Sequence, residues 1–136
     1  MNLNRKTVKR KFIFLGGQSL LHLRKFNRGF SRAQLVEFDD LETFEHTKMK
    51  PLSVTLAVEG KTRRVLGFSV AQMPAKGHLA KKSFLKYGPR KDERVNGRKN
   101  LFCSIKGLIE EKALIKSDQN PHYPEDVKKY FKDCTV

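Results

Sequence analysis

Two apolar runs with a period of two residues, close together in the chain, constrain the fold more than any other feature. In "LSVTLAV", residues 52–58, every second side chain is large and apolar, and "RVLGFSVAQM", residues 64–73, repeats the pattern. Alternation of this kind predicts β-strands. The intervening "EGK" contains Gly60, which is free to adopt a positive φ and so predicts a tight turn. The two runs therefore predict an antiparallel hairpin.

The flanking segments extend this hairpin into a larger unit. "QLVEFD", residues 34–39, predicts a preceding strand, and "ALIKSD", residues 113–118, predicts a fourth. Between them, an apolar stripe that ends at Ile109 predicts a helix starting near Asp92. A last helix is predicted around Pro124, which suits a first helical turn. The order strand–strand–strand–helix–strand–helix predicts an α/β fold with a mixed sheet.

The N-terminal region has a different character. Residues 1–34 contain nine Lys or Arg and no acid. Asn4 as N-cap and Gly16 as a stop predict one short helix, and Ser19 as N-cap predicts a second. We therefore divide the chain into a basic helical segment, residues 1–33, and an α/β domain, residues 34–136. The basic, polar residues 75–100 are predicted to form a loop that lies along a nucleic-acid backbone or moves freely in solvent.

The net charge of the 136-residue chain is +15, which is typical of proteins that bind polyanions, with nucleic acid as the first partner to consider. No apolar run approaches the ~20 residues needed to cross a bilayer. The apolar patch near the N-terminus, residues 12–15, is shorter than the core of a signal peptide. The sequence thus favours a cytoplasmic, nucleoid-associated protein without a membrane partner.

The acidic residues point to a different kind of chemistry. Asp39 and Asp118 each stand at the end of a predicted strand, and they come together if those strands are neighbours. Carboxylates held side by side repel each other unless a cation lies between them. Oxygen ligands without Cys or His favour Mg²⁺ or Mn²⁺, which can support displacement at a phosphodiester. The alternative is that Asp39 with Asp40, and "SDQN", simply begin turns.

Three stretches resemble the catalytic region of bacterial insertion-sequence transposases of the DDE type, which have an RNase H-like, retroviral-integrase fold. They are "VEFDDLETFEHTKMKPLSVTLAVEGKTRRVLGFSVAQMPAKGHLA", "KKSFLKYGPRKDER" and "IKSDQNPHYPEDVKKYF", within residues 34–131. The resemblance implies that Asp39 and Asp118 are catalytic metal ligands for Mg²⁺ or Mn²⁺ and that Asp40 is an auxiliary acid. "LNRKTVKRKF" is similar to the recognition helix of a helix-turn-helix domain. Such transposases act as multimers on double-stranded DNA, which implies a homo-oligomer.

The chain also departs from this family. The third acid of the family, usually Glu, lies on a later helix after a fifth strand, whereas this chain ends at "KDCTV". Glu125, Asp126 and Asp133 follow Asp118 too closely to take that role. The expectation is a truncated transposase with an incomplete sheet at the C-terminus, an incomplete active site and very low activity on its own.

Two other functions remain open. One is a non-catalytic basic protein that binds nucleic acid through its charge alone, and the other is a nuclease or resolvase of the same fold. In each case the expected DNA contacts are exposed cations in the N-terminal segment and in residues 75–100, namely Arg5, Lys6, Lys9, Arg10, Lys81, Lys82, Lys86 and Arg90.

Overall fold

The computed structural model describes residues 4–118, 120–121 and 123–131. The chain forms two compact units, Met1–Ser31 and Arg32–Val136. We describe each unit by itself.

The first unit consists of a single helix, α1 (Arg5–Arg28). Asn4 caps it as predicted, because its side-chain oxygen accepts a hydrogen bond of 2.9 Å from the backbone N–H of Lys6. The predicted break at Gly16 and the predicted cap at Ser19 are wrong, since the helix runs through both residues. A glycine inside a helix costs about 1 kcal/mol relative to alanine, which lowers stability without ending the helix when strong helix formers lie on both sides.

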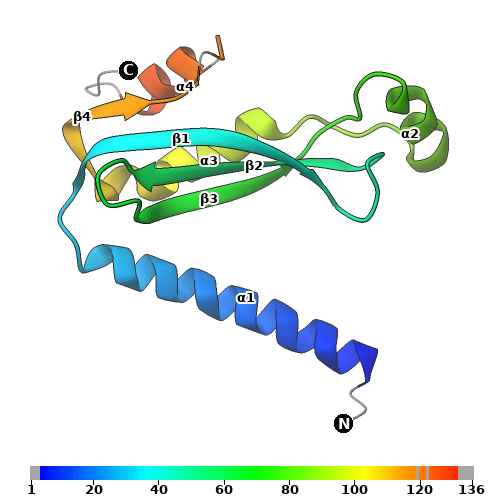
Figure 1. The fold of residues 1–136 in the computed structure, drawn as a ribbon, viewed down its shortest axis with the longest axis horizontal. Helices are drawn as coiled ribbons and strands as arrows, with labels where there is room; N and C mark the ends of the chain where they lie inside the picture. Colours follow the sequence, from blue (N-terminus) through cyan, green and yellow to red (C-terminus); the bar gives the residue numbers. More distant parts are fainter. Residues whose placement is uncertain (1–3, 119, 122, 132–136) are drawn as a thin grey trace. The chain divides into compact units, whose positions relative to one another are not determined.

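The second unit contains a four-stranded mixed sheet with the order β3-β2-β1-β4 (Figure 1). Its strands are β1 (Ala33–Phe44), β2 (Pro51–Glu59), β3 (Val65–Gln72) and β4 (Ile109–Lys116). β1 pairs with β2, and β2 with β3, in antiparallel register, whereas β1 and β4 are parallel. The predicted α/β class with a mixed sheet is confirmed, and the first and fourth strands are neighbours, which is the condition under which Asp39 and Asp118 come together.

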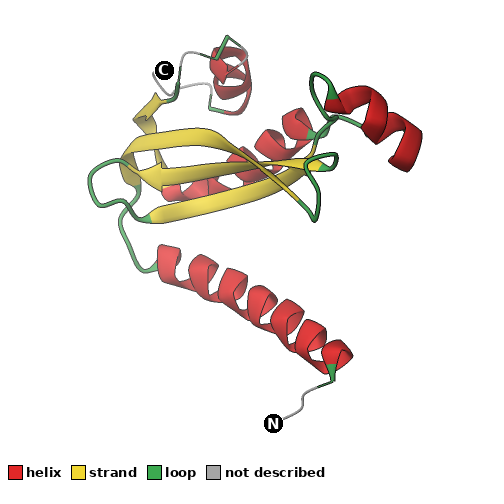
Figure 2. Ribbon diagram, turned by 45° about the vertical axis from the view of Figure 1, so that its right-hand side comes forward, coloured by secondary structure: helices red, strands yellow, loops and turns green. Residues whose placement is uncertain are grey.

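Three helices complete this unit: α2 (Leu79–Tyr87), α3 (Arg94–Ile105) and α4 (Tyr123–Tyr130). Helix α3 packs on β2 and β3, and α4 packs on α3 (Figure 2). The sequence did not predict α2, because lysines interrupt its apolar residues and only Ser83 is buried. The other two helices are close to their predicted positions.

Several predicted boundaries differ from the structure. β1 continues five residues past Asp39, so this aspartate lies inside the strand and not at its end. β4 begins at Ile109, which was expected in the preceding helix, and ends two residues before Asp118. A short 3-10 turn, Lys106–Leu108, separates α3 from β4. Apolar residues in succession suit either element, so tertiary pairing decided where each begins.

The turn between β2 and β3 is wider than predicted. The residue with positive φ is Arg63 (φ 61°), and Gly60 is not in this region. Glu59 and Arg64 close the turn, the N–H of Glu59 donating to the carbonyl oxygen of Arg64 at 2.9 Å. The role of Gly60 is close approach, because a Cβ there would lie 2.7 Å from the side chain of Leu35.

Helix α3 covers one face of the sheet, which we call the covered face. On β2 this face carries small or polar residues, Ser53, Thr55 and Ala57. On β3 it includes Gly67, where a Cβ would lie 2.8 Å from Cγ2 of Ile105 in α3. These small residues let the helix backbone approach the sheet closely. The core of the unit is built around Phe38, Leu101, Phe102, Ile115 and Val127.

Candidate active site

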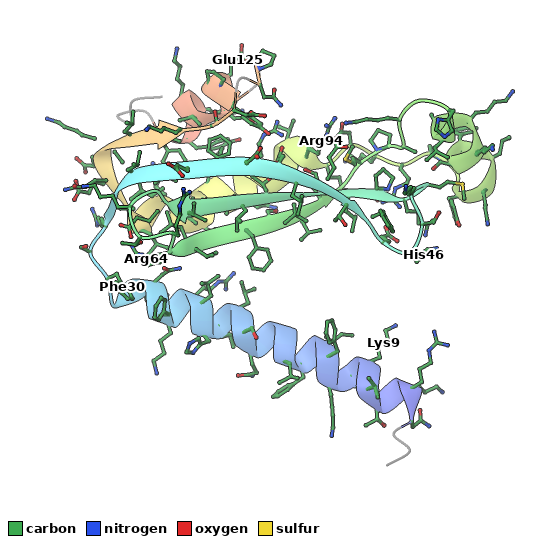
Figure 3. All side chains as sticks on the ribbon, viewed as in Figure 1. Lys9, Phe30, His46, Arg64, Arg94 and Glu125 are labelled. Carbon is green, nitrogen blue, oxygen red and sulfur yellow. The ribbon has the colours of Figure 1, made fainter. Side chains whose placement is uncertain are left out.

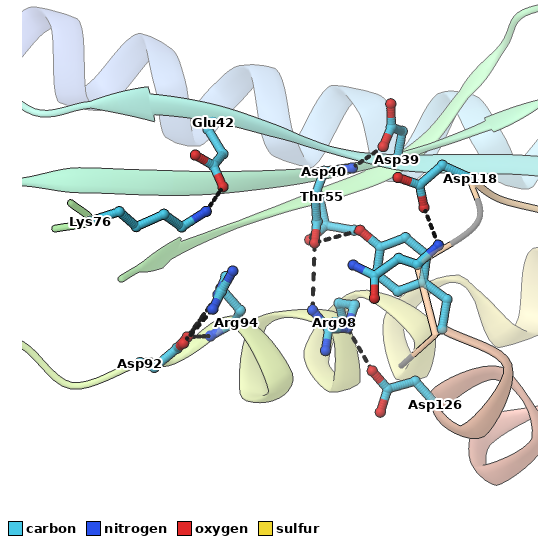
Figure 4. A network of polar contacts seen from close by, with 12 residues as sticks. Asp39, Asp40, Glu42, Thr55, Lys76, Asp92, Arg94, Arg98, Asp118 and Asp126 are labelled. Atoms are coloured by element: carbon cyan, nitrogen blue, oxygen red, sulfur yellow. Dashed lines mark hydrogen bonds and ion pairs between the residues drawn. The ribbon is translucent and has the colours of Figure 1, made fainter. Parts of the chain in front are cut away.

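The parallel pairing of β1 and β4 brings the two predicted catalytic acids to corresponding positions. Glu37 pairs with Lys116 at the end of the ladder, and Asp39 and Asp118 each lie two residues farther along (Figure 4). Both are exposed. The Oδ1 of Asp39 accepts a 2.7 Å hydrogen bond from the N–H of Asp40, and the Oδ1 of Asp118 accepts one of 3.2 Å from the N–H of Asn120. The two acids thus stand on neighbouring segments.

Asp39 and Asp40 lie on opposite faces of the sheet, because successive side chains of a strand alternate. Asp39 is opposite Leu56 on β2, and Leu56 is opposite Phe68 on β3. This row belongs to the face that we call the open face, where Leu56 and Phe68 are exposed by 40% and 46%. Asp40 is on the covered face, beside α3 and α4.

Asp40 is held by three side chains from three elements. Thr55, its cross-strand partner on β2, donates a hydrogen bond to Oδ1. The hydroxyl of Tyr123 in α4 donates to Oδ2 at 2.8 Å, and Nη1 of Arg98 in α3 lies 3.5 Å from the same oxygen. The side chain of Asp40 is only 14% exposed. The geometry therefore engages both carboxylate oxygens of Asp40 within the protein.

Arg98 links the same network to a second carboxylate. Its Nε donates to Oδ2 of Asp126 at 2.6 Å, and its Cζ lies 5.3 Å from the centre of the Tyr123 ring. Its side chain is 7% exposed. A buried guanidinium requires such partners, because an unpaired buried charge costs several kcal/mol. Arg98 joins α3 to β1 through Asp40 and to α4 through Asp126.

The environment of Tyr123 changes its acidity. Burial raises the pKa of this phenol, and its hydrogen bond to the Asp40 carboxylate raises the pKa further. Both effects penalise the phenolate, one by removing solvent and the other by placing a negative charge next to the oxygen. Tyr123 is therefore a neutral hydrogen-bond donor well above physiological pH.

A polar cleft of about 410 Å³ opens beside this network. Four carboxylates (Asp40, Asp92, Glu125 and Asp126) and two guanidinium groups (Arg94 and Arg98) line it. Arg94 pairs with Asp92, with 2.6 Å between Nη2 and Oδ2. The hydrogen bonds from Arg94 lower the pKa of Asp92, and the same contact raises the pKa of Arg94. Figure 3 labels Arg94 and Glu125 on the two helices that border the cleft, α3 and α4.

The predicted DNA contacts have different surroundings. The four residues of α1 (Arg5, Lys6, Lys9 and Arg10) and the three lysines of α2 (Lys81, Lys82 and Lys86) are exposed. The side chain of Arg90 is only 11% exposed. Its guanidinium binds Glu45 at 3.0 Å and the carbonyl oxygens of Met73 and Pro51 at 3.3 Å each. Arg90 thus connects the segment after β3 to the β1–β2 connection, and its guanidinium is engaged within the protein.

Within the described residues, no three His, Cys, Asp or Glu side chains gather closely enough to hold one metal ion. The pair Asp39 and Asp118 supplies hard oxygen donors of the type that Mg²⁺ prefers. Mg²⁺ is commonly bound through one or two protein carboxylates together with substrate phosphates and water. In donor chemistry and number, the pair fits that minimal arrangement.

No family model matches this chain, and comparisons with curated proteins and with solved structures also find no match. None of the helices described here is both long enough and apolar enough to cross a membrane.

Sequence reasoning missed Thr55, Arg98 and Tyr123 as members of the network. Thr55 had a usable signal, because its alternation with Ser53 and Ala57 marks a second face of β2. Arg98 had none, since it is one of 29 Lys and Arg residues and the charge of its neighbours does not distinguish it. Tyr123 immediately precedes Pro124, which marks the first turn of the predicted last helix. Its hydrogen-bond partner Asp40 is distant in the sequence, so no local pattern indicates the contact.

Proposed function

We propose that this chain carries the catalytic region of a DDE-type DNA transposase, with an RNase H-like sheet and with Asp39 and Asp118 as two of its catalytic carboxylates. The supporting observation is the parallel register of β1 and β4, which sets these residues at corresponding positions on neighbouring segments. The strand order β3-β2-β1-β4, with three antiparallel strands followed by a parallel fourth, is compatible with that fold.

In this proposal the chain's residues have three tasks. Asp39 and Asp118 would hold Mg²⁺ or Mn²⁺, which when bound supplies Lewis-acid activation of a phosphodiester. Asp40 keeps α3 and α4 against β1 and so supports the site from the covered face. The net charge of +15 attracts the DNA backbone and raises its local concentration at the site.

The two exposed acids and the buried one allow a direct test by Mn²⁺ titration calorimetry. We expect the parent chain to bind Mn²⁺ and both Asp39→Asn and Asp118→Asn to lose that binding. Asp40→Asn is the matched control, because it changes the adjacent carboxylate but leaves Asp39 in place, and it should retain Mn²⁺ binding. Circular dichroism checks that each variant is folded.

The alternative function is a non-catalytic nucleic-acid binder, which the overall charge favours equally. If the folded parent bound DNA but no Mn²⁺, the transposase proposal would fail and the binder would remain. Mn²⁺ binding that is lost in Asp40→Asn and kept in Asp39→Asn would instead place the metal on the covered face. In an assay of Mg²⁺-dependent strand transfer, we expect very low activity from this chain alone, because Asp39 and Asp118 are only two of the three acids of the family; efficient strand transfer would contradict the expected incomplete site.

A further inference from the structure

Helix α2 presents apolar and basic side chains together. Ser83 is its one buried residue within the helix, whereas Phe84 and Leu85 are exposed by 60% and 75%. Lys81, Lys82 and Lys86 are also exposed. A nine-residue helix gains little stability from its own hydrogen bonds, so contacts outside the helix must hold it.

Those contacts attach α2 to the end of the sheet. The Ser83 hydroxyl donates to the carbonyl oxygen of Met49, in the β1–β2 connection, at 2.6 Å. Arg90 fixes the segment that follows α2 through Glu45 and the backbone of Met73 and Pro51. These contacts hold α2 at its middle, through Ser83, and just after its C-terminal end, through Arg90, so its exposed face is attached to the end of the sheet.

A groove of about 390 Å³ lies between α2 and the segments 74–75 and 88–90. Its walls are mainly apolar and include Pro74, Ala80, Phe84 and Pro89, while Lys81 contributes a cation. This volume is within the range of about 300–1,000 Å³ that is typical of small-ligand pockets. An aromatic ring beside flat, apolar proline and alanine surfaces suits a planar ligand.

The positive charge around the groove indicates that its ligand is negatively charged. Residues 74–91, which run from one wall of the groove through α2 to the other wall, contain six Lys or Arg and no acid. Two of these cations are already paired, Lys76 with Glu42 and Arg90 with Glu45. The nearby Glu45 is already paired with Arg90 and with Lys50, and its hydrogen bond with Arg90 lowers its pKa. Lys50 and Lys86 also lie within 4.8 and 5.5 Å of the Tyr87 ring centre. Figure 3 labels His46 in the same β1–β2 connection, and its ring contacts Tyr87 edge-on.

We propose that this groove binds single-stranded DNA, with an unpaired base stacked on Phe84 and the flanking phosphates held by the lysines of α2. In a duplex each base is stacked between its neighbours, so its face is not accessible to a side chain. Exposed aromatic rings within a basic surface are the usual platform for unpaired strands. The choice of DNA over RNA rests on the proposed function, whereas the preference for a single strand rests on the groove.

The test compares two neighbouring residues of α2. Fluorescence anisotropy measures binding of the full chain to labelled oligothymidylate of about 20 nucleotides and to a duplex of equal length, at one fixed salt concentration. Phe84→Ala should weaken single-strand binding by about 5- to 150-fold, the range expected for one base–aromatic stack, and leave duplex binding within about twofold. Leu85→Ala is the matched control, because it removes a more exposed apolar side chain that does not line the groove.

Three outcomes would overturn the proposal: unchanged single-strand binding in Phe84→Ala, an equal loss for duplex and single strand, or an equal loss in Leu85→Ala. Thermal unfolding of both variants separates lost binding from lost fold. The test is also independent of the metal site. A chain that binds no Mn²⁺ but shows the Phe84 effect would refute the transposase proposal alone, and Mn²⁺ binding without that effect would refute the groove proposal alone.

Discussion

The two faces of the sheet differ in a way that the apolar pattern does not suggest. The covered face of β2 carries Ser53, Thr55 and Ala57, which are nearly inaccessible to solvent. The open face carries larger apolar residues, and among them Leu41 and Val70 are exposed by 66% and 53%. The comparison teaches that α3 covers the face on which β2 and β3 carry small side chains, because these allow close approach. A small residue lets a helix lie near the sheet, while a large one keeps it away.

The same contrast appears in two consecutive residues of β1. Asp39 on the open face contacts a backbone N–H and solvent, whereas Asp40 on the covered face is engaged by Thr55, Arg98 and Tyr123. The pair has identical chemistry and opposite surroundings. One aspartate is therefore available to a ligand, and the other is committed to the fold.

Removal of the guanidinium from the covered face should produce the largest effect. Arg98→Ala leaves the carboxylates of Asp40 and Asp126 facing each other without a cation. We expect a loss of about 3–5 kcal/mol in the free energy of unfolding, measured by urea denaturation. Arg94→Ala is the control, since the pair of Arg94 with Asp92 is more exposed, and it should cost less than about 1 kcal/mol. Equal losses would remove the distinction between the two arginines.

Neutralisation of each aspartate in β1 tests the contrast between the faces directly. Asp40→Asn weakens hydrogen bonds to a charged acceptor and should lower the free energy of unfolding by about 1.5–3 kcal/mol. Asp39→Asn should change it by less than about 0.5 kcal/mol, because the side chain is exposed and its Oδ1 is retained. A greater loss of stability in Asp39→Asn would reverse the assignment of the two faces.

The close packing of α3 on β3 can be tested with glycine substitutions. Gly67→Ala places a methyl group 2.8 Å from Cγ2 of Ile105, which is buried and cannot move away. We expect a loss of about 1–3 kcal/mol from overpacking. Gly107→Ala is the control, since a Cβ there meets nothing within 4 Å. Similar thermal unfolding of the two variants would show that the contact between α3 and β3 is not tightly packed at Gly67.

Tyr123→Phe removes one of the three side-chain contacts of Asp40 and should lower the free energy of unfolding at neutral pH by about 1.5 kcal/mol, the lower end of the range for a hydrogen bond to a charged group. Its pH dependence is more informative. Because the folded-state pKa of Tyr123 is raised above its ordinary value near 10, the stability it contributes is complete below about pH 10. That stability is lost as the pH rises from there through the folded-state pKa, by up to about 1.4 kcal/mol per pH unit. The variant should lack this component of alkaline destabilisation, and parallel pH profiles for parent and variant would contradict the assignment.

Much of the secondary structure was predictable because it depends on local pattern. The alternation in β2, the Asn4 cap and the position of Pro124 in α4 are all signals within a few residues of each other. Boundaries that depend on pairing were not predictable. β1 extends to Phe44 because every residue of β2 has a partner on β1. The residues after Asp39 carry no sequence pattern that indicates this pairing.

The candidate site divides in the same way. The sequence alone picked out Asp39 and Asp118 as a pair, although its placement of Asp39 at a strand end is wrong, and the parallel pairing of β1 and β4 sets the two acids at corresponding positions. It could not separate the environment of Asp40 from that of its neighbour, and it did not find Arg98 or Tyr123.

The sequence by itself determined the strongly basic charge, the α/β class and the chain positions of the acids. Only the tertiary structure decided which face of the sheet is covered, which aspartate is buried and where α2 presents Phe84. The physical reason is the range of the interactions. Capping and alternation act over a few residues, whereas the contacts of Arg98 join β1, α3 and α4, which are adjacent only in the folded chain.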